Sequence, residues 1–463
     1  MLANFLKHRG FFAQLLRLAV PVAIQSMLVS ILNMVDVLMV GFLGSEAIAA
    51  VGLGSKIHFV AILVMAGIAT GCSVLVAQYW GKSDHQGARA VVSLAMVTGV
   101  LLLTPITLFL MVFATELYEL ANNDAQVTLL GAEYLWLTAP TLIATHFIIV
   151  YEGGLRSLGQ TMLPLVFAAL AIALNIALNY ALIGGHWGAP ELGVAGAAYA
   201  TDISRVFQVI LLVGFIWWRQ HPLKLRWQDL QNGLAPEQLS RFAQVTWPLV
   251  VNFTLWSVGS FCYHLIAGRL GTEPLAVISL MTPLESLYHS LFFGLSSACS
   301  IMIGHRLGRD EFQVAKQLAQ FFVIVGPILS FLLGVVIVLN KQLIFGLFGD
   351  IDSETLHLAN QVIIIMGLFF WIKVLNLILI QGILRSGGDN KFCLYNDMLC
   401  MWAIGLPITA MAAFVWQWDY WMVYGLVLVE EVTKGLLSIW RYRKGYWLKN
   451  LTVNREDKGK VLA

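Results

Sequence analysis

The feature that most constrains this chain is a succession of long apolar segments separated by short polar connections. A helix needs about 20 apolar residues to cross a bilayer, and every segment reaches that length. Lipid offers no hydrogen-bond partners to an open backbone, so such segments fold as helices. We therefore predict an all-α membrane protein with twelve transmembrane helices, over residues 15–41, 48–78, 90–115, 126–152, 161–184, 193–218, 242–268, 275–304, 313–340, 356–384, 391–416 and 419–440.

Composition supports a membrane location. Hydrophobic residues make up 59% of the chain and charged residues only 12%, whereas a soluble protein carries about 25% charged residues. The basic start leads into an apolar segment that is too long for a signal peptide, so we expect the first helix to be retained. The net charge of +2 gives no reason to expect a nucleic-acid partner.

The basic residues concentrate on one side of the predicted topology. Of the 28 lysines and arginines, 22 lie near the termini or in the loops that the twelve spans place on the same side as the termini. The opposite loops are acidic and hold only Arg269 and Lys341 as basic residues. Because cytoplasmic loops are enriched in lysine and arginine, we predict that both termini are cytoplasmic.

An internal repeat divides the chain. Residues 67–82 match residues 294–309 at an offset of 227, and residues 153–160 resemble residues 382–389 at a slightly larger offset. Five single residues also recur at the offset of 227: Pro21 as Pro248, Gly41 as Gly268, Leu43 as Leu270, Gly44 as Gly271 and Ala49 as Ala276.

Each copy of the repeat holds six predicted helices, so both copies insert in the same direction. Parallel repeats of this kind are a transporter architecture. We predict two six-helix lobes, related by a pseudo-two-fold axis along the membrane normal. The N-terminal lobe is residues 1–218 and the C-terminal lobe residues 241–445, with a cytoplasmic linker at 219–240 and a cytoplasmic tail at 446–463.

The repeat fails at Asp36, which lies inside the first apolar segment and corresponds to Tyr263 in the second half. A charged carboxylate in the membrane costs several kcal/mol unless it finds partners or a proton, and such residues are usually functional. Sequence drift is the alternative explanation for the asymmetry. Pro21, 15 residues earlier, removes a backbone donor and can kink a helix, so we predict that it is a hinge.

Other polar side chains of the first lobe fall at the same depth as Asp36. From a rise of 1.5 Å per residue, the set lies roughly 7–14 Å below the outer surface. Burial favours a protonated carboxyl group whereas nearby donors favour the carboxylate, so the set suits binding and release of H+ or Na+. The predicted cation-coupling site consists of Asp36, Asn175, Asn179, Tyr134, Thr201 and Asp202.

Each partner of Asp36 also has a structural interpretation. The two asparagines can bridge helices by hydrogen bonding, and the tyrosine can anchor a helix at the membrane interface. The threonine can serve helix packing. Asp202 and Arg205 are three residues apart and can form an intrahelical ion pair.

The second half carries its own charges inside apolar segments: Glu285, Lys373, Glu430, Glu431 and Lys434. Glu430 and Lys434 are four residues apart and can pair on one helical face. The set forms either a structural charge network or a site for a cationic substrate or a coupling ion. The five cysteines lie in apolar segments without metal-ligand spacing, so we expect no metal site and no cofactor.

Three strings carry a family resemblance: PV…NMVD…GFLGSEAIAAVGL at the start, VAQYWGK at the end of the second segment, and EGGLRSLGQT after the fourth. Together they resemble the multidrug and toxic compound extrusion (MATE) family over nearly the whole chain. The resemblance implies a transporter of the bacterial cytoplasmic (inner) membrane, not an enzyme. It implies export of cationic and amphipathic compounds, driven by entry of H+ or Na+.

Within that family the chain is similar to the DinF-like branch, which places its key acid on helix one. The branch's aspartate on helix one, asparagine on helix five and proline on helix one match Asp36, Asn175 and Pro21. A second acid sometimes found one turn later on helix five is Asn179 here, which favours H+ over Na+. The other bacterial branch has acids on helices seven and ten, whereas helix ten carries Lys373 here.

The resemblance leads to an expected mechanism, proton-coupled antiport by alternating access, in which protonation of Asp36 bends the first helix near Pro21. We expect organic cations or amphipathic drugs as substrates, membrane lipids as surroundings and a monomer. The alternatives are a Na+-coupled exporter with the same site and a lipid-linked oligosaccharide flippase, which should have a strongly basic central cavity. No HExxH or GxSxG motif supports a membrane-embedded enzyme.

Overall fold

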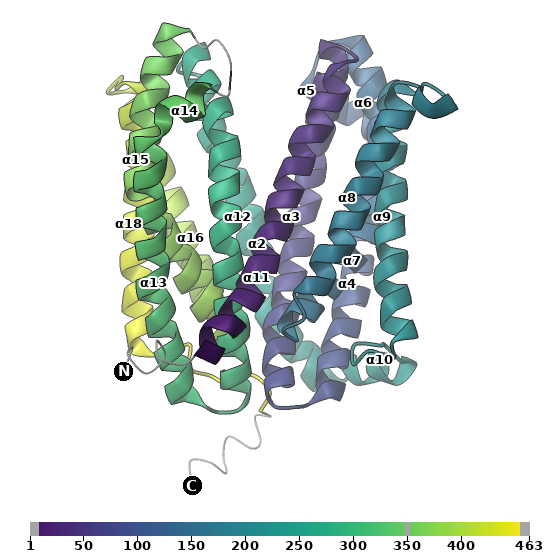
Figure 1. Ribbon diagram of the computed structural model, residues 1–463, viewed down its shortest axis with the longest axis vertical. Coiled ribbons are helices and arrows are strands. Elements are labelled where there is room, and N and C mark those ends of the chain that lie inside the picture. The colour runs from purple at the N-terminus through teal and green to yellow at the C-terminus, as the bar shows by residue number, and fades with distance from the viewer. Residues whose placement is uncertain (1–8, 347, 349–351, 454–463) are drawn as a thin grey trace. The chain divides into compact units, whose positions relative to one another are not determined.

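The computed structural model describes residues 9–346, 348 and 352–453 (Figure 1). These ranges are almost entirely helical and contain no strand. Helix packing divides them into an N-terminal unit, Ile24–Val250, and a C-terminal unit that holds the described residues before Ile24 and after Val250. Some charged residues that support the predicted orientation lie outside the described residues: Lys7, Asp350, Arg455, Lys458 and Lys460.

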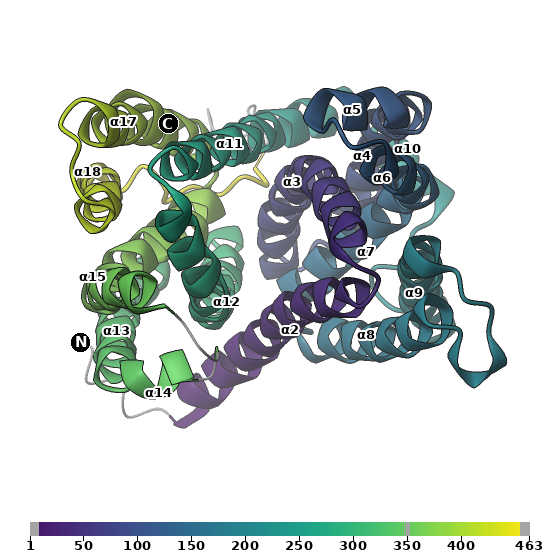
Figure 2. The same ribbon diagram turned by 90° about the horizontal axis from the view of Figure 1, so that it is seen from above.

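The N-terminal unit is a bundle in which α8 and α9 lie side by side and α3 packs on α4 and α7 (Figure 2). Side chains cap two of its helices: Asp84 accepts from Gly87 N (2.8 Å), and Asp124 accepts from Gln126 N (2.8 Å). The elements of the unit are α2 (Arg9–Gly41) from Ile24 onward, α3 (Ser45–Gly81), α4 (His85–Val112), α5 (Ala114–Ala121), α6 (Ala125–Thr138), α7 (Thr141–Ser157), α8 (Met162–Ile183), η1 (His186–Gly188), α9 (Gly193–Trp218), α10 (Trp227–Gly233) and the start of α11 (Pro236–Gly268).

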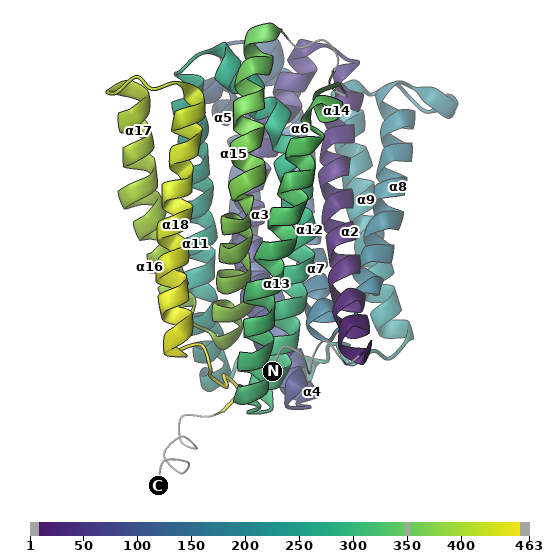
Figure 3. The same ribbon diagram turned by 60° about the vertical axis from the view of Figure 1, so that its left-hand side comes forward.

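The C-terminal unit packs α15 against α12, α13 and α18, and α18 also lies beside α16 and α17 (Figure 3). Its apolar core joins these helices through buried side chains such as Met281, Phe321, Ile363 and Val374. The elements are the rest of α11, α12 (Thr272–Gly308), α13 (Phe312–Leu339), α14 (Lys341–Gly346), α15 (Ser353–Leu377), η2 (Ile378–Leu384), η3 (Arg385–Gly387), α16 (Asn390–Met398), η4 (Leu399–Gly405), α17 (Leu406–Phe414) and α18 (Tyr420–Lys444).

All twelve predicted spans correspond to helices of the described chain, and the predicted all-α membrane fold is confirmed. Ten helices are long and apolar enough to cross a membrane, and the pair α6–α7 makes an eleventh span with a bend of 50°. Pro140 lies in the break between these two helices, because proline lacks a backbone donor. The twelfth helix, α18, is less apolar since Glu430, Glu431 and Lys434 lie in its middle.

Two spans of the C-terminal unit are interrupted by π-helical turns, the tenth by η2 and the eleventh by η4. The corresponding helices of the N-terminal unit, α7 and α8, are regular. π turns disturb the i→i−4 ladder and occur frequently at functional sites. Gly405, at the end of η4, leaves room for a buried carboxylate, because a Cβ there would lie 2.7 Å from Glu430 Oε2.

The chain passes between the two units at equivalent positions of the repeat. One boundary falls two residues after Pro21, inside α2, and the other falls two residues after Pro248, inside α11. Both helices continue through their prolines. The lobe boundaries at residues 218 and 241, and the axis that relates the lobes, stay predictions.

Candidate functional site

A chain of hydrogen bonds begins at Asp36 on α2 and continues to α8 and α9. Asn179 Nδ2 donates to Asp36 Oδ1 (2.7 Å) and to Asn175 Oδ1 (3.0 Å). Asn175 Nδ2 donates to Ser204 Oγ (3.3 Å), and Ser204 Oγ donates to the carbonyl oxygen of Thr201 (2.9 Å). Four of the six predicted site residues are therefore linked directly or through Ser204.

Helical spacing and packing position this chain. Asn175 and Asn179 are one turn apart, so they share one face of α8, and both are almost completely buried. Asp36 is half-buried. Tyr134 packs against an apolar cluster, which consists of Val40, Ala47, Val51, Ile183, Val194 and Ala197.

Tyr134, on α6, lies near the predicted site. It lies within electrostatic range of Asp36 and Asp202. A glycine admits its ring, because a Cβ at Gly54 would lie 2.9 Å from Tyr134 Cδ1. The tyrosine therefore faces the predicted site from a fourth helix.

Asp202, on α9, is a neighbour of the chain rather than a link in it. Its Oδ1 is buried and has no hydrogen-bond partner within the described residues, and Thr141 faces the carboxyl group. The ion pair with Arg205 that the spacing allows is not formed, because Arg205 interacts instead with Glu152, Asp36 and Tyr134. Thr201 contributes its main-chain carbonyl to the chain.

The sequence interpretation missed a second buried acid, Glu152 on α7, which is 7% exposed. Gln208 Nε2 donates to Glu152 Oε1 (3.0 Å), and Gln25 of α2 faces the same carboxyl group. Arg205 lies in electrostatic range of both Glu152 and Asp36. The sequence did distinguish Glu152, because it is an acid at the end of the fourth apolar segment and its repeat partner is the uncharged Gln381.

Three buried oxygen acceptors of this region have no hydrogen-bond partner in the part of the chain that the structure describes: Asn179 Oδ1, Asp202 Oδ1 and Gln25 Oε1. Leaving such an atom unsatisfied costs about 1–3 kcal/mol. Unpaired oxygens can accept a new O–H donor, and oxygen is also the ligand that hard cations prefer. The donor set therefore fits a coupling cation.

The C-terminal unit holds a longer polar chain, which we call the charge ladder and which consists of Arg385, Asn252, Asp397, Lys434, Glu430 and Tyr263. Arg385 donates to Asn252 Oδ1 (2.6 Å), and Asn252 Nδ2 donates to Asp397 Oδ2 (2.7 Å). Lys434 Nζ lies 3.4 Å from Asp397 Oδ1 and 3.0 Å from Glu430 Oε1. Tyr263 OH donates to Glu430 Oε2 (2.5 Å).

The charge ladder contains two cations and two carboxylates, so its formal charges balance. Both carboxylates contact the ammonium group of Lys434. Sequence reasoning placed Glu430 and Lys434 in the second-lobe network but missed Asp397, Asn252 and Arg385. Asp397 was visible as an acid in the eleventh segment, whereas the faces that Asn252 and Arg385 present depend on packing.

The remaining predicted charges of the C-terminal unit lie outside the charge ladder. Glu431 accepts from Asn376 Nδ2 (2.7 Å). Lys373 Nζ lies 3.9 Å from Glu285 Oε2, and Tyr424 OH donates to Glu285 Oε1 (2.5 Å). Within the described residues, no contact ion pair joins Glu285 and Lys373 to the charge ladder, whereas Glu431 lies in electrostatic range of Lys434.

The division of the chain into two helical units agrees with the comparison with protein families, which matches two segments of the chain. A family model described as MatE matches residues 21–181 and 248–411, which is well over half of the chain. The chain belongs to the MatE family, which is a family of transporters rather than enzymes. The two matches start at the repeat partners Pro21 and Pro248.

Individual relatives and solved structures are similar over nearly the whole chain. The "Probable multidrug resistance protein NorM" of Thermotoga maritima is 24% identical over 453 residues, which are 96% of this chain and 94% of that protein. A crystal structure of a variant MATE transporter of Vibrio cholerae is 20% identical with a TM-score of 0.85, covering 95% of this chain and 98% of that chain. A MATE described as being in the bent conformation is 19% identical with a TM-score of 0.80, covering 93% and 94%. These structures share the fold, and the DinF-like branch stays a prediction.

Proposed function

We propose that this chain is a secondary active multidrug exporter, which moves cationic or amphipathic organic compounds out of the cell in exchange for H+. Membership of the MatE family supports transport, and the Thermotoga relative is named a probable multidrug resistance protein. The observation that carries the coupling step is the contact of Asp36 with Asn179, whose own carboxamide oxygen has no partner within the described residues.

The Asp36–Asn179 contact suits a proton switch. As a carboxylate, Asp36 accepts a hydrogen bond from Asn179 Nδ2 (2.7 Å), and a charge-assisted bond is roughly twice as strong as a neutral one. Once protonated, Asp36 becomes an O–H donor and needs an acceptor. Asn179 Oδ1 has no other partner within the described residues, so it can accept from protonated Asp36 once the carboxamide turns over. One proton then reverses the direction of the hydrogen bond between α2 and α8.

The same contact favours H+ over Na+ as the coupling ion. A hard cation needs several oxygen ligands around it. Asn179 presents a nitrogen donor to Asp36 and to Asn175. The Asn179 carboxamide must turn over for its oxygen to face either ion, but Na+ then needs several further oxygen ligands, whereas the proton needs this one acceptor.

Movement of α2 near Pro21 would convert the switch into transport. Proline cannot donate the backbone hydrogen bond that holds a helix straight, and the N-terminal unit begins at Ile24, three residues after Pro21. The description of one similar structure as bent supports flexibility of this kind within the family. Bending of α2 on protonation of Asp36 would narrow the first-lobe cavity and displace the substrate outward, after which alternating access resets the transporter.

The proposed setting is the bacterial cytoplasmic (inner) membrane, with both termini in the cytoplasm and the chain acting as a lipid-surrounded monomer. The distribution of basic residues, 22 of 28 on the side of the termini, supports this orientation. We expect no cofactor, because the gradient of the coupling ion supplies the energy for transport. The wider proposed site includes Tyr134, Thr201 and Asp202 beside the Asp36–Asn179–Asn175 chain.

Transport in proteoliposomes tests the proposal. Vesicles loaded with a fluorescent organic cation receive either a pH gradient without Na+ or a Na+ gradient at uniform pH. We expect efflux in the first case, loss of efflux in Asp36→Asn, and normal efflux in the matched control Glu46→Gln, because Glu46 is exposed. Wild-type efflux by Asp36→Asn contradicts the coupling role, and efflux under the Na+ gradient alone replaces H+ by Na+.

The same vesicles distinguish the flippase alternative. A lipid-linked oligosaccharide flippase would translocate that lipid without exporting the organic cation under either gradient. Export of the cation with no lipid-linked oligosaccharide movement supports a drug exporter.

A further inference from the structure

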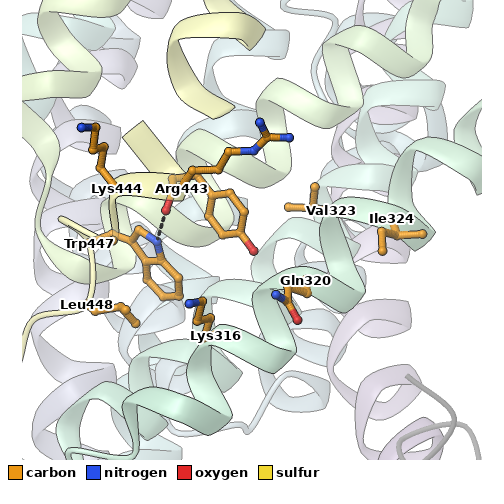
Figure 4. A pocket seen from close by; sticks show the side chains of 10 residues that line it. Lys316, Gln320, Val323, Ile324, Arg443, Lys444, Trp447 and Leu448 are labelled. Carbon is orange, nitrogen blue, oxygen red and sulfur yellow. Dashed lines mark hydrogen bonds between the residues drawn. The ribbon is translucent and has the colours of Figure 1, made fainter. Parts of the chain in front are cut away.

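A groove of about 580 Å³ lies at one end of the C-terminal unit, where α13 begins and α18 ends (Figure 4). One wall is the first part of α13, and the other is the end of α18 with the segment that follows it. Its lining combines basic side chains with apolar and aromatic ones: Lys316, Gln320, Val323, Ile324, Tyr442, Arg443, Lys444, Gly445, Trp447 and Leu448.

The α13 wall changes polarity along its length. Lys316, Gln320, Val323 and Ile324 follow the spacing i, i+4, i+7 and i+8 and therefore share one helical face. The polar pair lies toward the helix start, and the apolar pair lies roughly 10–12 Å further along the axis from Lys316. A molecule with a polar head and an apolar tail matches this order of side chains.

Three bases supply the charge of the groove, and we call Lys316, Arg443 and Lys444 the basic trio. All three are exposed, and none forms an ion pair with a carboxylate of the described residues. Acids at this end of the unit are already engaged, Glu311 by Arg306 and Asp389 by Arg441. Within the described residues, the basic trio therefore has no carboxylate in ion-pair contact.

The second wall is held in place by specific contacts. Gly445 ends α18 in the left-handed conformation (φ +74°), which turns the chain back toward α13. Trp447 is buried, donates its indole N–H to Tyr442 O (3.1 Å) and stacks on the Tyr442 ring. Asn450 Nδ2 then ties the segment to Gly308 O (3.2 Å). The groove is thus a preformed feature of the fold.

We propose that this groove binds an anionic phospholipid of the membrane. The basic trio would hold the phosphodiester, since juxtamembrane lysine and arginine attract acidic headgroups and basic pockets between helices bind them. Val323, Ile324 and Leu448 would receive the start of an acyl chain. A free phosphate has no use for the apolar part of the groove, which is why the lipid is the occupant.

Native mass spectrometry of the full chain in detergent tests the site. The probes are phosphatidylglycerol, phosphatidylcholine with the same acyl chains, and inorganic phosphate. The test variant is Lys316→Gln/Arg443→Gln/Lys444→Gln. The matched control removes three other bases, Lys82→Gln/Arg219→Gln/Lys224→Gln, so that both proteins have the same net charge.

We expect one retained phosphatidylglycerol that binds on the order of 100-fold more weakly to the test variant, because each base near the headgroup contributes about five-fold. The control variant should bind like the wild type, and phosphatidylcholine and phosphate should not be retained. Ile324→Gln should also weaken phosphatidylglycerol binding, since it places a polar group against the acyl chain.

Three outcomes overturn the proposal. Equal weakening in the control variant shows attraction by overall charge only, and equal retention of phosphatidylcholine shows that the headgroup charge plays no part. Retention of phosphate as strong as that of phosphatidylglycerol shows an anion site without a lipid. Binding is measured without transport, so the result does not depend on the proposed export function.

Discussion

The polar chains of the two units differ in how their charges are partnered. In the N-terminal unit, Asp36 contacts a neutral carboxamide and forms no ion pair within 4.0 Å in the described residues. In the C-terminal unit, Asp397 and Glu430 both contact Lys434. A carboxylate without a contacting cation changes its state when a proton arrives, whereas a paired one resists that change. The difference supports the proposal that the switch lies in the N-terminal unit, and it predicts a scaffold role for the charge ladder.

Comparison of repeat partners sharpens this contrast. On the first helix of each half, Asp36 corresponds to Tyr263; on the last helix, Thr201 corresponds to Glu430 at the slightly larger offset. The acid and the hydroxyl have therefore exchanged helices between the two halves. In the C-terminal unit the pair is closed, with Tyr263 OH bonded to Glu430, whereas Asp36 turns to Asn179 on α8 instead.

The largest expected effect is on stability, from removal of the cation of the charge ladder. Lys434→Ala leaves the buried Glu430 and the half-buried Asp397 uncompensated, and breaking a buried pair in this way costs about 3–5 kcal/mol. Thermal unfolding of the purified protein should show it. The matched variant Arg205→Ala removes a cation without a contact ion pair and should cost less; equal losses would contradict the contrast between the units.

A second comparison separates coupling from scaffolding by two isosteric changes. Asp36→Asn should lower H+-driven efflux by at least about 100-fold, which corresponds to roughly 2.7 kcal/mol, with little change in unfolding temperature. Glu430→Gln should keep H+-driven efflux but unfold at a lower temperature, because the contact with Lys434 loses its charge. If Glu430→Gln uncouples transport as well, the charge ladder belongs to the coupling machinery.

A third comparison concerns the hydrogen-bond donors to the two acids. Tyr263→Phe removes the hydroxyl that donates to Glu430 and should cost about 1–3 kcal/mol of stability, since a buried charged acceptor loses a partner. Asn179→Ala removes the donor to Asp36 and should instead reduce efflux by about 10-fold, the effect of one such hydrogen bond. Unfolding and efflux are measured for both variants, and a reversed pattern of losses would contradict the assignment.

Much of the fold was readable from the sequence because the membrane restricts the choices. Segment length and backbone satisfaction require helices, and the twelve predicted spans correspond to twelve helical segments. Span position also gave depth, so the level shared by Asp36 and Asn179 was predictable before their contact was seen. The π turns η2 and η4 were not predictable, because they arise from packing against neighbouring helices.

Contacts that depend on side-chain direction were the part that could not be predicted. The spacing of Asp202 and Arg205 allows an ion pair, yet the two form none, and Arg205 lies in electrostatic range of Glu152 and Asp36. Asp202 and Arg205 correspond to Glu431 and Lys434 in the second half. Those two form no contact ion pair either, since Lys434 contacts Glu430 and Asp397. Spacing sets what is possible along one helix, and contacts with other helices decide among the possibilities.

The smallest expected effect tests the hinge through the two repeat-related prolines. Alanine is about 3 kcal/mol more favourable than proline in a helix interior, so Pro21→Ala should stiffen α2 and raise the unfolding temperature. Because movement of α2 is proposed to follow protonation of Asp36, Pro21→Ala should slow H+-driven efflux several-fold, as substitutions at hinges do.

Pro248→Ala is the matched control, because it stiffens α11 at the equivalent position. That helix carries no proposed switch acid, so this variant should slow efflux less. Unchanged efflux in Pro21→Ala would remove the hinge from the mechanism, and equal slowing in both variants would show that the two units bend together at both crossings of the chain.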